Sequence, residues 1–352
     1  MHVNPFLATV IGDLVKRAVR ISDVAAAAGV SNTTVSHALN GKGRLPEATR
    51  ERVRAVARKL GYQPSVLARG LAGGRTGMLA VTVSFVEDEP LAVADFDYFL
   101  QVMNGASAEA LKRGLSLMLL PTDSRRDPFV QLPLDGAIVM DPVPGDEIVD
   151  ILDKRGIPVV TTGRRPDGPP DACWVDNDHV AGTRIMVDHL VDRGSTRIAL
   201  LTAPVLSTYT QDALGAFEAR CDERGVESIV EHLPGEALSE SGAYAAASRL
   251  LESPKPPDGI YATLDRVALG ALLAAEAKGI SVPQQLRIAG CTDSTASRAA
   301  RPSLTALSLN PERIGQEAIG LLVELIEDGT PEDGQRIVPY SMIPRGSTAE
   351  VG

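Results

Sequence analysis

Apolar residues recur at intervals of three or four in two short runs near the start of the chain. The first run is Ile21, Val24, Ala25 and Ala28, and the second is Val35, Ala38 and Leu39. This spacing is typical of one buried helix face, and Gly29 between the runs permits the left-handed backbone of a turn. The pattern predicts two short helices that meet at a tight turn.

Polar residues at the ends of these runs predict where the helices begin. Ser22 is expected to cap the first helix, and Ser31, followed by Thr34, the second. A third helix is predicted from Glu47, after Pro46, to Gly61. Its apolar face, which is expected to close a small core, comprises Val53, Val56, Ala57 and Leu60.

From Met78 onward, short apolar runs alternate with amphipathic segments. The predicted strands cover 78–84, 115–120, 136–140, 157–162, 197–202, 228–233, 259–263 and 286–291. The predicted helices between them cover 98–113, 147–155, 180–193, 211–224, 241–252 and 266–278. Such alternation is typical of parallel sheets covered by helices, and it repeats after residue 175. The sequence therefore predicts two similar Rossmann-like halves.

Composition and charge distinguish the N-terminal part of the chain from the rest. The chain has 352 residues, 44% hydrophobic and 23% charged, which suits a globular protein of two or three domains. The first 76 residues hold twelve Lys and Arg against four acidic residues, a net charge of +8 that leaves −18 for the remainder. A basic module on an acidic body is expected to bind phosphates at one chosen face.

Three isolated cysteines and the lack of long apolar runs indicate the compartment. Cys173, Cys221 and Cys291 have no paired spacing, which argues against both a disulfide framework and a zinc ribbon. No run approaches the roughly 20 apolar residues that cross a bilayer, and Asp13 interrupts the apolar start. We expect a cytoplasmic, nucleoid-associated protein with no membrane partner.

The second short helix carries an outward face of small hydrogen-bonding side chains. This face comprises Ser31, Asn32, Thr33, Thr34, Ser36, His37 and Asn40. In a helix-turn-helix unit the second helix lies in the major groove and presents its first turn to base edges. Asn32 and Thr33 are therefore expected to read bases, whereas Ser31 and Ser36 contact phosphates. The alternative is a merely solvated helix start.

Motifs of the common catalytic sites are missing. The sequence contains no GxGxxG, GxxxxGK, HExxH or GxSxG, and its five histidines are scattered. The run Asp176, Asn177, Asp178 and His179 is the one dense group of possible metal ligands, but it lacks the glycine and terminal glutamate of a calcium loop. We interpret it as a strand-end turn and helix cap, and we expect no catalytic residue, metal or cofactor.

The stretch ISDVAAAAGVSNTTVSHALNGKGRLPEATRERVRAVARKLGYQPSVLARGLAGGRTG resembles the LacI/GalR (lactose-repressor) family of bacterial transcription regulators. Weaker similarity continues to about Pro344. The resemblance implies a helix-turn-helix domain at 19–63, a hinge helix and linker at 64–76, and a periplasmic-binding-protein-like core at 77–346 that binds an effector and dimerises. The core chain would cross between two subdomains near 175 and 303. Residues 1–18 precede the resemblance and are expected to be a dispensable extension.

The family resemblance also implies a second kind of DNA contact. Residues 64–71, PSVLARGL, look like the hinge helix, and eight residues are too few for a stable isolated helix. Two such helices of a dimer would pack in the minor groove, where Ala68 and Leu71 contact DNA and Leu71 acts as an apolar wedge. Family members usually carry Arg at the place of His37 and a capping Thr at that of Arg20.

In the family an effector lies in the cleft between the subdomains, and this chain departs from the pattern there. Asp212 occupies a slot where relatives commonly have a ligand-gripping Arg, and Thr292, before Asp293, replaces a common ligand-binding Asp. A site that lacks this cation should disfavour anions. The hypothesis is a neutral polyol or a cation held by Asp97, Asp212 and Asp265, with Tyr98 or Phe99 stacking on it. The alternative is that Asp212 only caps its helix.

Two further expectations complete the resemblance. The loop TDSRRDPFVQLPLD stands where the family has room for a full helix. The leading hypothesis is a dimeric repressor that binds a pseudo-palindromic operator and is controlled by a small, sugar-like effector. The alternative is a sugar-binding protein with a vestigial DNA-binding module, and an enzyme is the third.

Overall fold

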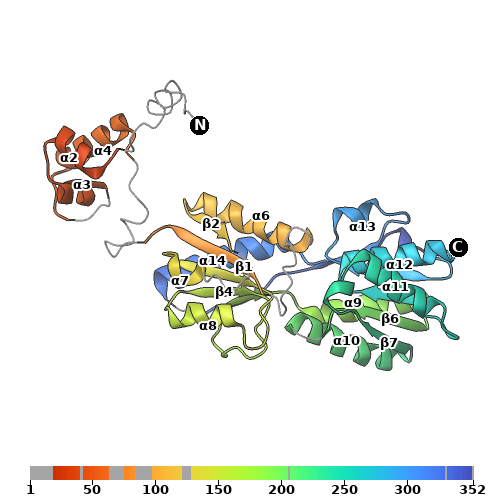
Figure 1. Cartoon of the computed structure of the whole chain (residues 1–352). Coiled ribbons are helices and arrows are strands. Elements are labelled where there is room, and N and C mark those ends of the chain that lie inside the picture. Colours follow the sequence, from red (N-terminus) through yellow and green to blue (C-terminus); the bar gives the residue numbers. More distant parts are fainter. Residues whose placement is uncertain are drawn as a thin grey trace, which may run out of the picture. The chain divides into compact units, whose positions relative to one another are not determined.

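The computed structural model describes residues 19–39, 43–62, 75–84, 97–120, 128–204, 207–329 and 331–350 (Figure 1). The chain divides into two compact units, Met1–Thr76 and Gly77–Gly352. The hinge segment expected at 64–71, with Ala68 and Leu71, lies outside the described residues, as do residues 1–18 and Asn40.

The N-terminal unit is a three-helix bundle made of α2 (Ile21–Ala28), α3 (Asn32–Leu39) and α4 (Glu47–Leu60). Its buried core consists of Val24, Ala25, Ala28, Val35, Ala38, Val53 and Ala57. The small alanines allow close helix packing, and every predicted helix is present. Leu60, which was expected in this core, is 38% exposed because it lies at the last turn of α4 beside the Gly61 cap.

The starts of α2 and α3 differ in their caps. The Ser31 hydroxyl accepts a hydrogen bond from the Thr34 amide at 3.1 Å, which confirms Ser31 as the cap of α3. The prediction for Ser22 is wrong, because the cap of α2 is Arg20, whose amide donates to the Asp23 carboxylate at 2.8 Å. Ser22 therefore lies inside the first turn of α2 and is exposed.

The first half of the second unit is a six-stranded parallel sheet in the order β11-β5-β4-β3-β1-β2. Its strands are β1 (Met78–Val83), β2 (Ser116–Leu119), β3 (Gly136–Met140), β4 (Val159–Thr162), β5 (Trp174–Asp176) and β11 (Gln335–Ile337). Helices α6 (Asp97–Lys112) and α14 (Pro311–Asp328) cover one face, and α8 (Glu147–Lys154) covers the other. Between β2 and β3 the described residues form one short helix, α7 (Pro128–Gln131).

The second half repeats this order as β12-β10-β9-β8-β6-β7, with β12 antiparallel to β10. Its strands are β6 (Arg197–Thr202), β7 (Glu227–His232), β8 (Gly259–Ala262), β9 (Arg287–Cys291), β10 (Thr305–Ser308) and β12 (Ser341–Ile343). Its helices are α9 (His179–Asp192), α10 (Thr208–Arg224), α11 (Glu240–Leu251), α12 (Asp265–Ala277) and α13 (Thr295–Ala299), with single turns η3 (Gly235–Ala237) and η4 (Gly346–Thr348). The predicted pair of Rossmann-like halves, here called the first and second subdomains, is confirmed.

Three segments connect the subdomains, after β5, after β10 and after β11. The second connection falls between Ser308 and Pro311, later than the position expected near Ser303, because β10 still belongs to the second sheet. The buried Asn177 amide donates to the carbonyls of Leu309 at 3.1 Å and Val338 at 2.8 Å. One side chain thus ties all three connections together.

Helices α6 and α14 approach each other closely at two glycines. A Cβ added at Gly105 would lie 2.0 Å from the Glu312 carbonyl oxygen, and one at Gly315 would lie 2.0 Å from that of Val102. This packing fixes α6, whose first turn carries Tyr98. Among the described residues, no helix combines the length and apolarity needed to cross a membrane.

Candidate nucleic-acid interface and subdomain junction

The outward face of α3 is polar at its first turn. Ser31, Asn32 and Thr33 are exposed, whereas Val35 and Ala38 are fully buried against the bundle. Thr34, Ser36 and His37 are half-buried. The arrangement leaves the amide of Asn32 and the hydroxyl of Thr33 available to a partner, and it holds the helix start rigid through the Ser31 cap.

Two of the predicted contact residues also have structural roles. Ser31 and Thr34 bring their hydroxyl oxygens to 2.9 Å, so both belong to the cap of α3. His37 packs against the loop after α3, where a Cβ added at Gly43 would lie only 2.8 Å from its Nδ1. A larger residue at Gly43 would displace the His37 ring, so the absence of a side chain at position 43 lets the ring take this place.

The N-terminal unit also exposes positive charge on α4 and the loop before it. Exposed cationic residues of α4 and the preceding loop are Arg44, Arg52, Arg54, Arg58 and Lys59. Glu47 pairs with Arg50 at 3.6 Å and with Arg54 at 4.0 Å, so a part of this charge is neutralised locally. The remainder is available to phosphates.

A second concentration of polar groups lies where strands of the first sheet end. Asp141 follows β3, Arg164 comes two residues after β4, and Asp176 is the last residue of β5. In open α/β sheets, ligands bind at the carboxyl ends of the strands. Asp141 and Arg164 did not appear among the sequence candidates, although each lies within two residues of the end of a predicted strand, which is the signal that would have found them.

Arg164 joins the two subdomains. Its Nε donates to Asp176 Oδ2 at 3.1 Å, and its Nη2 forms an ion pair with Asp212 on α10. Its carbonyl accepts a hydrogen bond from the Thr208 hydroxyl at 2.7 Å. Burial acts to lower the pKa of Arg164, but its bonds to Asp176 and Asp212 outweigh this and raise it. The expectation that the site lacks a cation is therefore wrong, because Arg164 comes from the opposite subdomain.

Asp176 is the buried anchor of this group. Its Oδ1 lies 2.7 Å from His179 Nε2 and accepts from the Asn177 amide at 2.8 Å. Burial acts to raise the pKa of Asp176, yet the bonds from His179, Arg164 and the Asn177 amide leave that pKa below its usual value. The carboxylate is thus ionised and shared between the two polar side chains.

The segment 176–179 is the predicted strand end and helix cap. Asp176 ends β5, and the Asp178 carboxylate accepts from the Ala181 amide at 2.9 Å at the start of α9. Within the part of the chain that the structure describes, no three His, Cys, Asp or Glu side chains converge as a metal site would require.

Asp141 is the carboxyl group at the junction with the most perturbed titration. Burial and the negative charge of Asp176 raise its pKa to about 7, against the opposing effect of His179. Its backbone adopts a φ of +49°, a left-handed conformation that Asp tolerates better than most residues. Near neutral pH, this carboxyl can therefore either donate or accept a hydrogen bond.

Two tyrosines line the same junction. Tyr98 packs against the core clusters of both subdomains, and burial together with Asp141 and Asp176 raises its pKa well above the usual value. The Tyr209 hydroxyl donates to the Thr263 carbonyl at 2.6 Å, and its ring centroid lies 4.6 Å from that of His179. We call Tyr98, Asp141, Arg164, Asp176, His179, Tyr209 and Asp212 the junction cluster.

The remaining predicted effector residues lie outside the junction cluster. Phe99 is 6% exposed and belongs to the core of the first subdomain, so the expected stacking role is corrected to a packing role. Asp265 is 5% exposed and accepts a hydrogen bond from the Ser294 amide, which connects the start of α12 to the cap of α13. Asp293 pairs with Arg345 at 2.6 Å. Thr292 is 8% exposed, and Asp97 begins α6 and is exposed.

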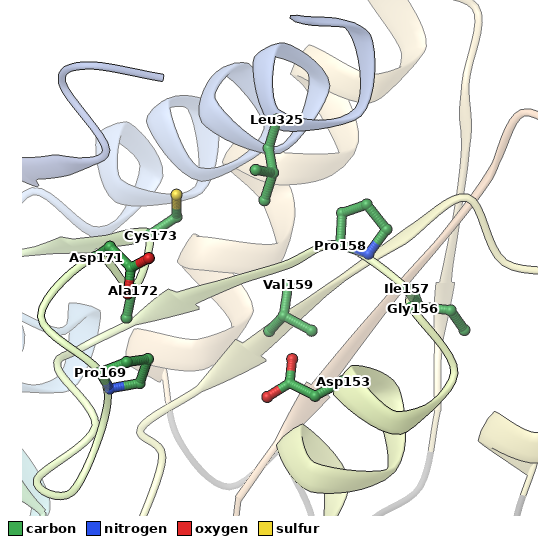
Figure 2. Close-up of a pocket in the computed structure, with 10 residues that line it drawn as sticks. All are labelled: Asp153, Gly156, Ile157, Pro158, Val159, Pro169, Asp171, Ala172, Cys173 and Leu325. Atoms are coloured by element: carbon green, nitrogen blue, oxygen red, sulfur yellow. The ribbon is translucent and has the colours of Figure 1, made fainter. Parts of the chain in front are cut away.

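A separate hollow of about 330 Å³ lies at the opposite end of β4. Asp153 of α8, Pro158 at the start of β4 and Leu325 of α14 line it, and Cys173 directs its sulfur toward α14 (Figure 2). The hollow is at the amino end of β4, whereas Arg164 follows the carboxyl end. It contains no residue of the junction cluster.

Comparisons with known proteins agree for both units. Residues 20–65 match the family described as "Bacterial regulatory proteins, lacI family", and residues 187–348 match "Periplasmic binding protein-like domain". The chain is 29% identical to the HTH-type transcriptional regulator CelR of Thermobifida fusca, over 92% of this chain and 96% of that one. It is 28% identical to the transcriptional repressor PurR of Mannheimia succiniciproducens, over 87% and 91%.

Solved structures show the same architecture. A CelR–cellobiose complex superimposes with a TM-score of 0.70 at 26% identity, covering 94% of this chain and 99% of that one. The lac repressor dimer bound to operator and the anti-inducer ONPF superimposes with a TM-score of 0.79 at 24% identity, again covering 94% and 99%. The fold is thus that of a helix-turn-helix module followed by a periplasmic-binding-protein-like core.

Proposed function

This chain belongs to the lacI family of bacterial regulatory proteins and is a DNA-binding transcriptional regulator with an effector-binding core, and we propose how it performs that task. We propose that it represses transcription as a homodimer on a pseudo-palindromic operator at the nucleoid, and that a small-molecule effector controls it. The observation that carries the proposal is the exposed first turn of α3, capped by Ser31, in a unit that also exposes several cationic side chains.

Each residue of the DNA face has a proposed role. Asn32 and Thr33 read base edges, because they are the exposed side chains at the end of α3 that enters the groove. Ser22, Ser31, Thr34 and Ser36 position the module on phosphates. His37 and Asn40 extend the face, and Ala68 and Leu71 contact the minor groove from the hinge segment.

The base-reading role is tested by exchanging the side chains of Asn32 and Thr33. After genome-wide footprinting has identified the operator, the double variant Asn32→Thr/Thr33→Asn is expected to prefer a different operator in a selection from random DNA. Ala55→Ser, on the exposed face of α4, is the matched control and should keep the original preference. Equal loss of affinity for all sequences would show that these side chains do not read bases.

The wedge role of Leu71 has a different signature. Leu71→Ala should weaken operator binding at least tenfold and random-DNA binding less than twofold, because a wedge contributes only where a deformable base step opens. Electrophoretic titration on both DNAs at one salt concentration measures the two losses. Equal losses of affinity for operator and random DNA would show that Leu71 does not act as a wedge.

We also propose that the effector is a neutral polyol or a cation and that it binds at the junction cluster. The charge of Arg164 is already matched by Asp176 and Asp212, so within the junction cluster, all of whose residues are described, an added anion would face the Asp141 carboxyl and find no unpaired arginine. Tyr98 offers an aromatic surface, and Asp97 and Asp212 offer acceptors. The presence of cellobiose, a neutral sugar, in the CelR complex supports this choice.

Calorimetry with three probes tests the charge preference. Cellobiose and glucosamine are expected to bind more tightly than glucose 6-phosphate, and Asp212→Ala should weaken glucosamine binding about tenfold. Asp222→Ala, an exposed aspartate near the end of the same helix, is the matched control. Tight glucose 6-phosphate binding that ignores Asp212 would contradict the proposal.

A further inference from the structure

Two neighbouring arginines after β4 form ion pairs of different reach. Arg165 pairs with Asp150 at 3.1 Å and with Asp167 at 2.8 Å, and both partners belong to the first subdomain. Arg164 pairs with Asp176 of the first subdomain and with Asp212 of the second. The guanidinium of Arg164 therefore connects the two subdomains directly, in addition to the three connecting segments and the packing of Tyr98.

Arg164 holds the second subdomain at two points. Its side chain binds Asp212, and its carbonyl accepts the Thr208 hydroxyl one turn earlier on α10. Both contacts fall on the first turns of α10, so they fix the position and the direction of that helix relative to β4. The two contacts together restrain the second subdomain more than either would alone.

The two carboxylates that hold Arg164 differ in their access to solvent. The Asp176 side chain is 4% exposed and is also bound by His179, whereas the Asp212 side chain is 23% exposed. Separating Arg164 from Asp176 would cost much free energy, because the buried Asp176 carboxylate would lose one of its partners. Separating Arg164 from Asp212 costs less, because water already reaches the Asp212 carboxylate. The contact with Asp212 is therefore the one that can be released.

We infer that Arg164 is a latch that holds the two subdomains together without a bound effector, and that an effector acts by drawing Asp212 away from it. The arm of the latch is the Arg164–Asp176 pair, and the catch is Asp212 on α10. The second clause of the inference rests on the proposed effector control, whereas the first concerns the protein alone. A cation suits the releasing role, because it neutralises Asp212 as the guanidinium leaves.

The latch is tested by the distance between the subdomains in the full-length protein without ligand or DNA. Spin labels go on Leu111→Cys in α6 and Glu276→Cys in α12, both exposed positions, while the three native cysteines are buried. Labelled chains are diluted into excess unlabelled protein so that only distances within one chain are measured. Pulsed dipolar spectroscopy then gives the distribution of separations.

Arg164→Ala and Asp212→Asn are each expected to shift this distribution by several ångströms, and the double variant should shift it no further. Arg165→Ala is the matched control and should leave the distribution unchanged, since its partners lie within one subdomain. Because Asp212 is partly exposed, Asp212→Asn keeps the test decisive if Arg164→Ala unfolds. An unchanged distribution in the folded variants would overturn the latch.

Chemical rescue tests the guanidinium itself. Ethylguanidinium, added at concentrations far below those that unfold proteins, should return the Arg164→Ala distribution to that of the original protein. It should have no effect when Asp212→Asn is also present. A distribution that ethylguanidinium leaves shifted would overturn the role of the guanidinium. Since no DNA is involved, failure of the operator experiments above would leave this result intact.

Discussion

The two subdomains share a strand order but differ at the edge where their strands end. In the first, β3, β4 and β5 lead to Asp141, Arg164 and Asp176. In the second, β8 leads to Thr263, and β9 leads to Thr292 and Asp293. The same scaffold therefore carries a charged edge in one half and a mainly neutral edge in the other.

The charged groups near the second edge are engaged within their own subdomain. Asp265 accepts from the Ser294 amide, and Asp293 pairs with Arg345 and with Arg298. By contrast, Arg164 of the first subdomain reaches Asp212 across the junction. We infer that Arg164 of the first subdomain can change its partners. The second subdomain contributes a surface whose polar groups are already bonded, together with the partly exposed Asp212 that Arg164 binds.

The largest expected effect compares one carboxylate from each edge. Asp176→Asn should lower the free energy of unfolding by about 3 kcal/mol, because it removes the buried charge that faces Arg164 and His179. Asp293→Asn should lower it by about 2 kcal/mol, because it loses a largely buried pair with Arg345, while its pair with Arg298 is half-exposed and screened by solvent. Urea unfolding followed by circular dichroism measures both.

The order of these two losses matters more than their size. If Asp293→Asn destabilised the protein more than Asp176→Asn, the charged strand ends of the first subdomain would not contribute more to stability than those of the second. Asp222→Asn, exposed on α10, serves as the control for removing a surface charge and should change stability by less than about 0.5 kcal/mol.

The next effect is a pH dependence of the free energy of unfolding that comes from Asp141 at the strand ends of the first subdomain. The pKa of Asp141 is raised to about 7 in the folded protein, against about 3.9 when unfolded. The folded state therefore binds the proton more tightly, so this contribution to stability is complete below pH 4 and is lost as the pH rises through 7. The residue keeps some solvent contact, so we expect a loss of about 2 kcal/mol rather than the full value of the shift.

Asp141→Asn isolates this contribution. The variant should gain stability relative to the original protein as the pH rises from 4 to 7, and the gain should stay constant above pH 7. Unfolding in urea at several pH values measures it. A stability difference that does not vary between pH 4 and 7 would contradict the raised pKa of Asp141.

The N-terminal unit could be predicted almost completely from sequence because its determinants are local. The Ser31 cap, the Gly29 turn and the helix α4 from Glu47 to Leu60 depend on residues within a few positions of one another. The wrong prediction for Ser22 also concerns residues only a few positions apart. Asp23 was near enough to bond the Arg20 amide, but an arginine at the cap position hides that possibility.

The strands and helices of the core were predictable for a similar reason, whereas the junction cluster was not. Arg164 lies 48 positions before Asp212 in the sequence, and no periodicity relates them. Asp212 alone therefore predicted a site without a cation. Phe99 and Tyr98 are adjacent, and only the packing of α6 decides that Phe99 enters the core while Tyr98 reaches both subdomains.

The smallest expected effect concerns the surface that the second subdomain contributes. The Tyr209 hydroxyl is bound to the Thr263 carbonyl at 2.6 Å, a contact within that subdomain, so Tyr209→Phe should lower the free energy of unfolding by about 1 kcal/mol. Because the hydroxyl is already engaged and the ring remains against His179, the dissociation constant for cellobiose or glucosamine should change by less than twofold. Tyr244→Phe, 39% exposed on α11, is the matched control and should leave both quantities unchanged. If Tyr209→Phe instead weakened binding tenfold without loss of stability, the second edge would be a ligand-responsive surface like the first, and the contrast between the two halves would fail.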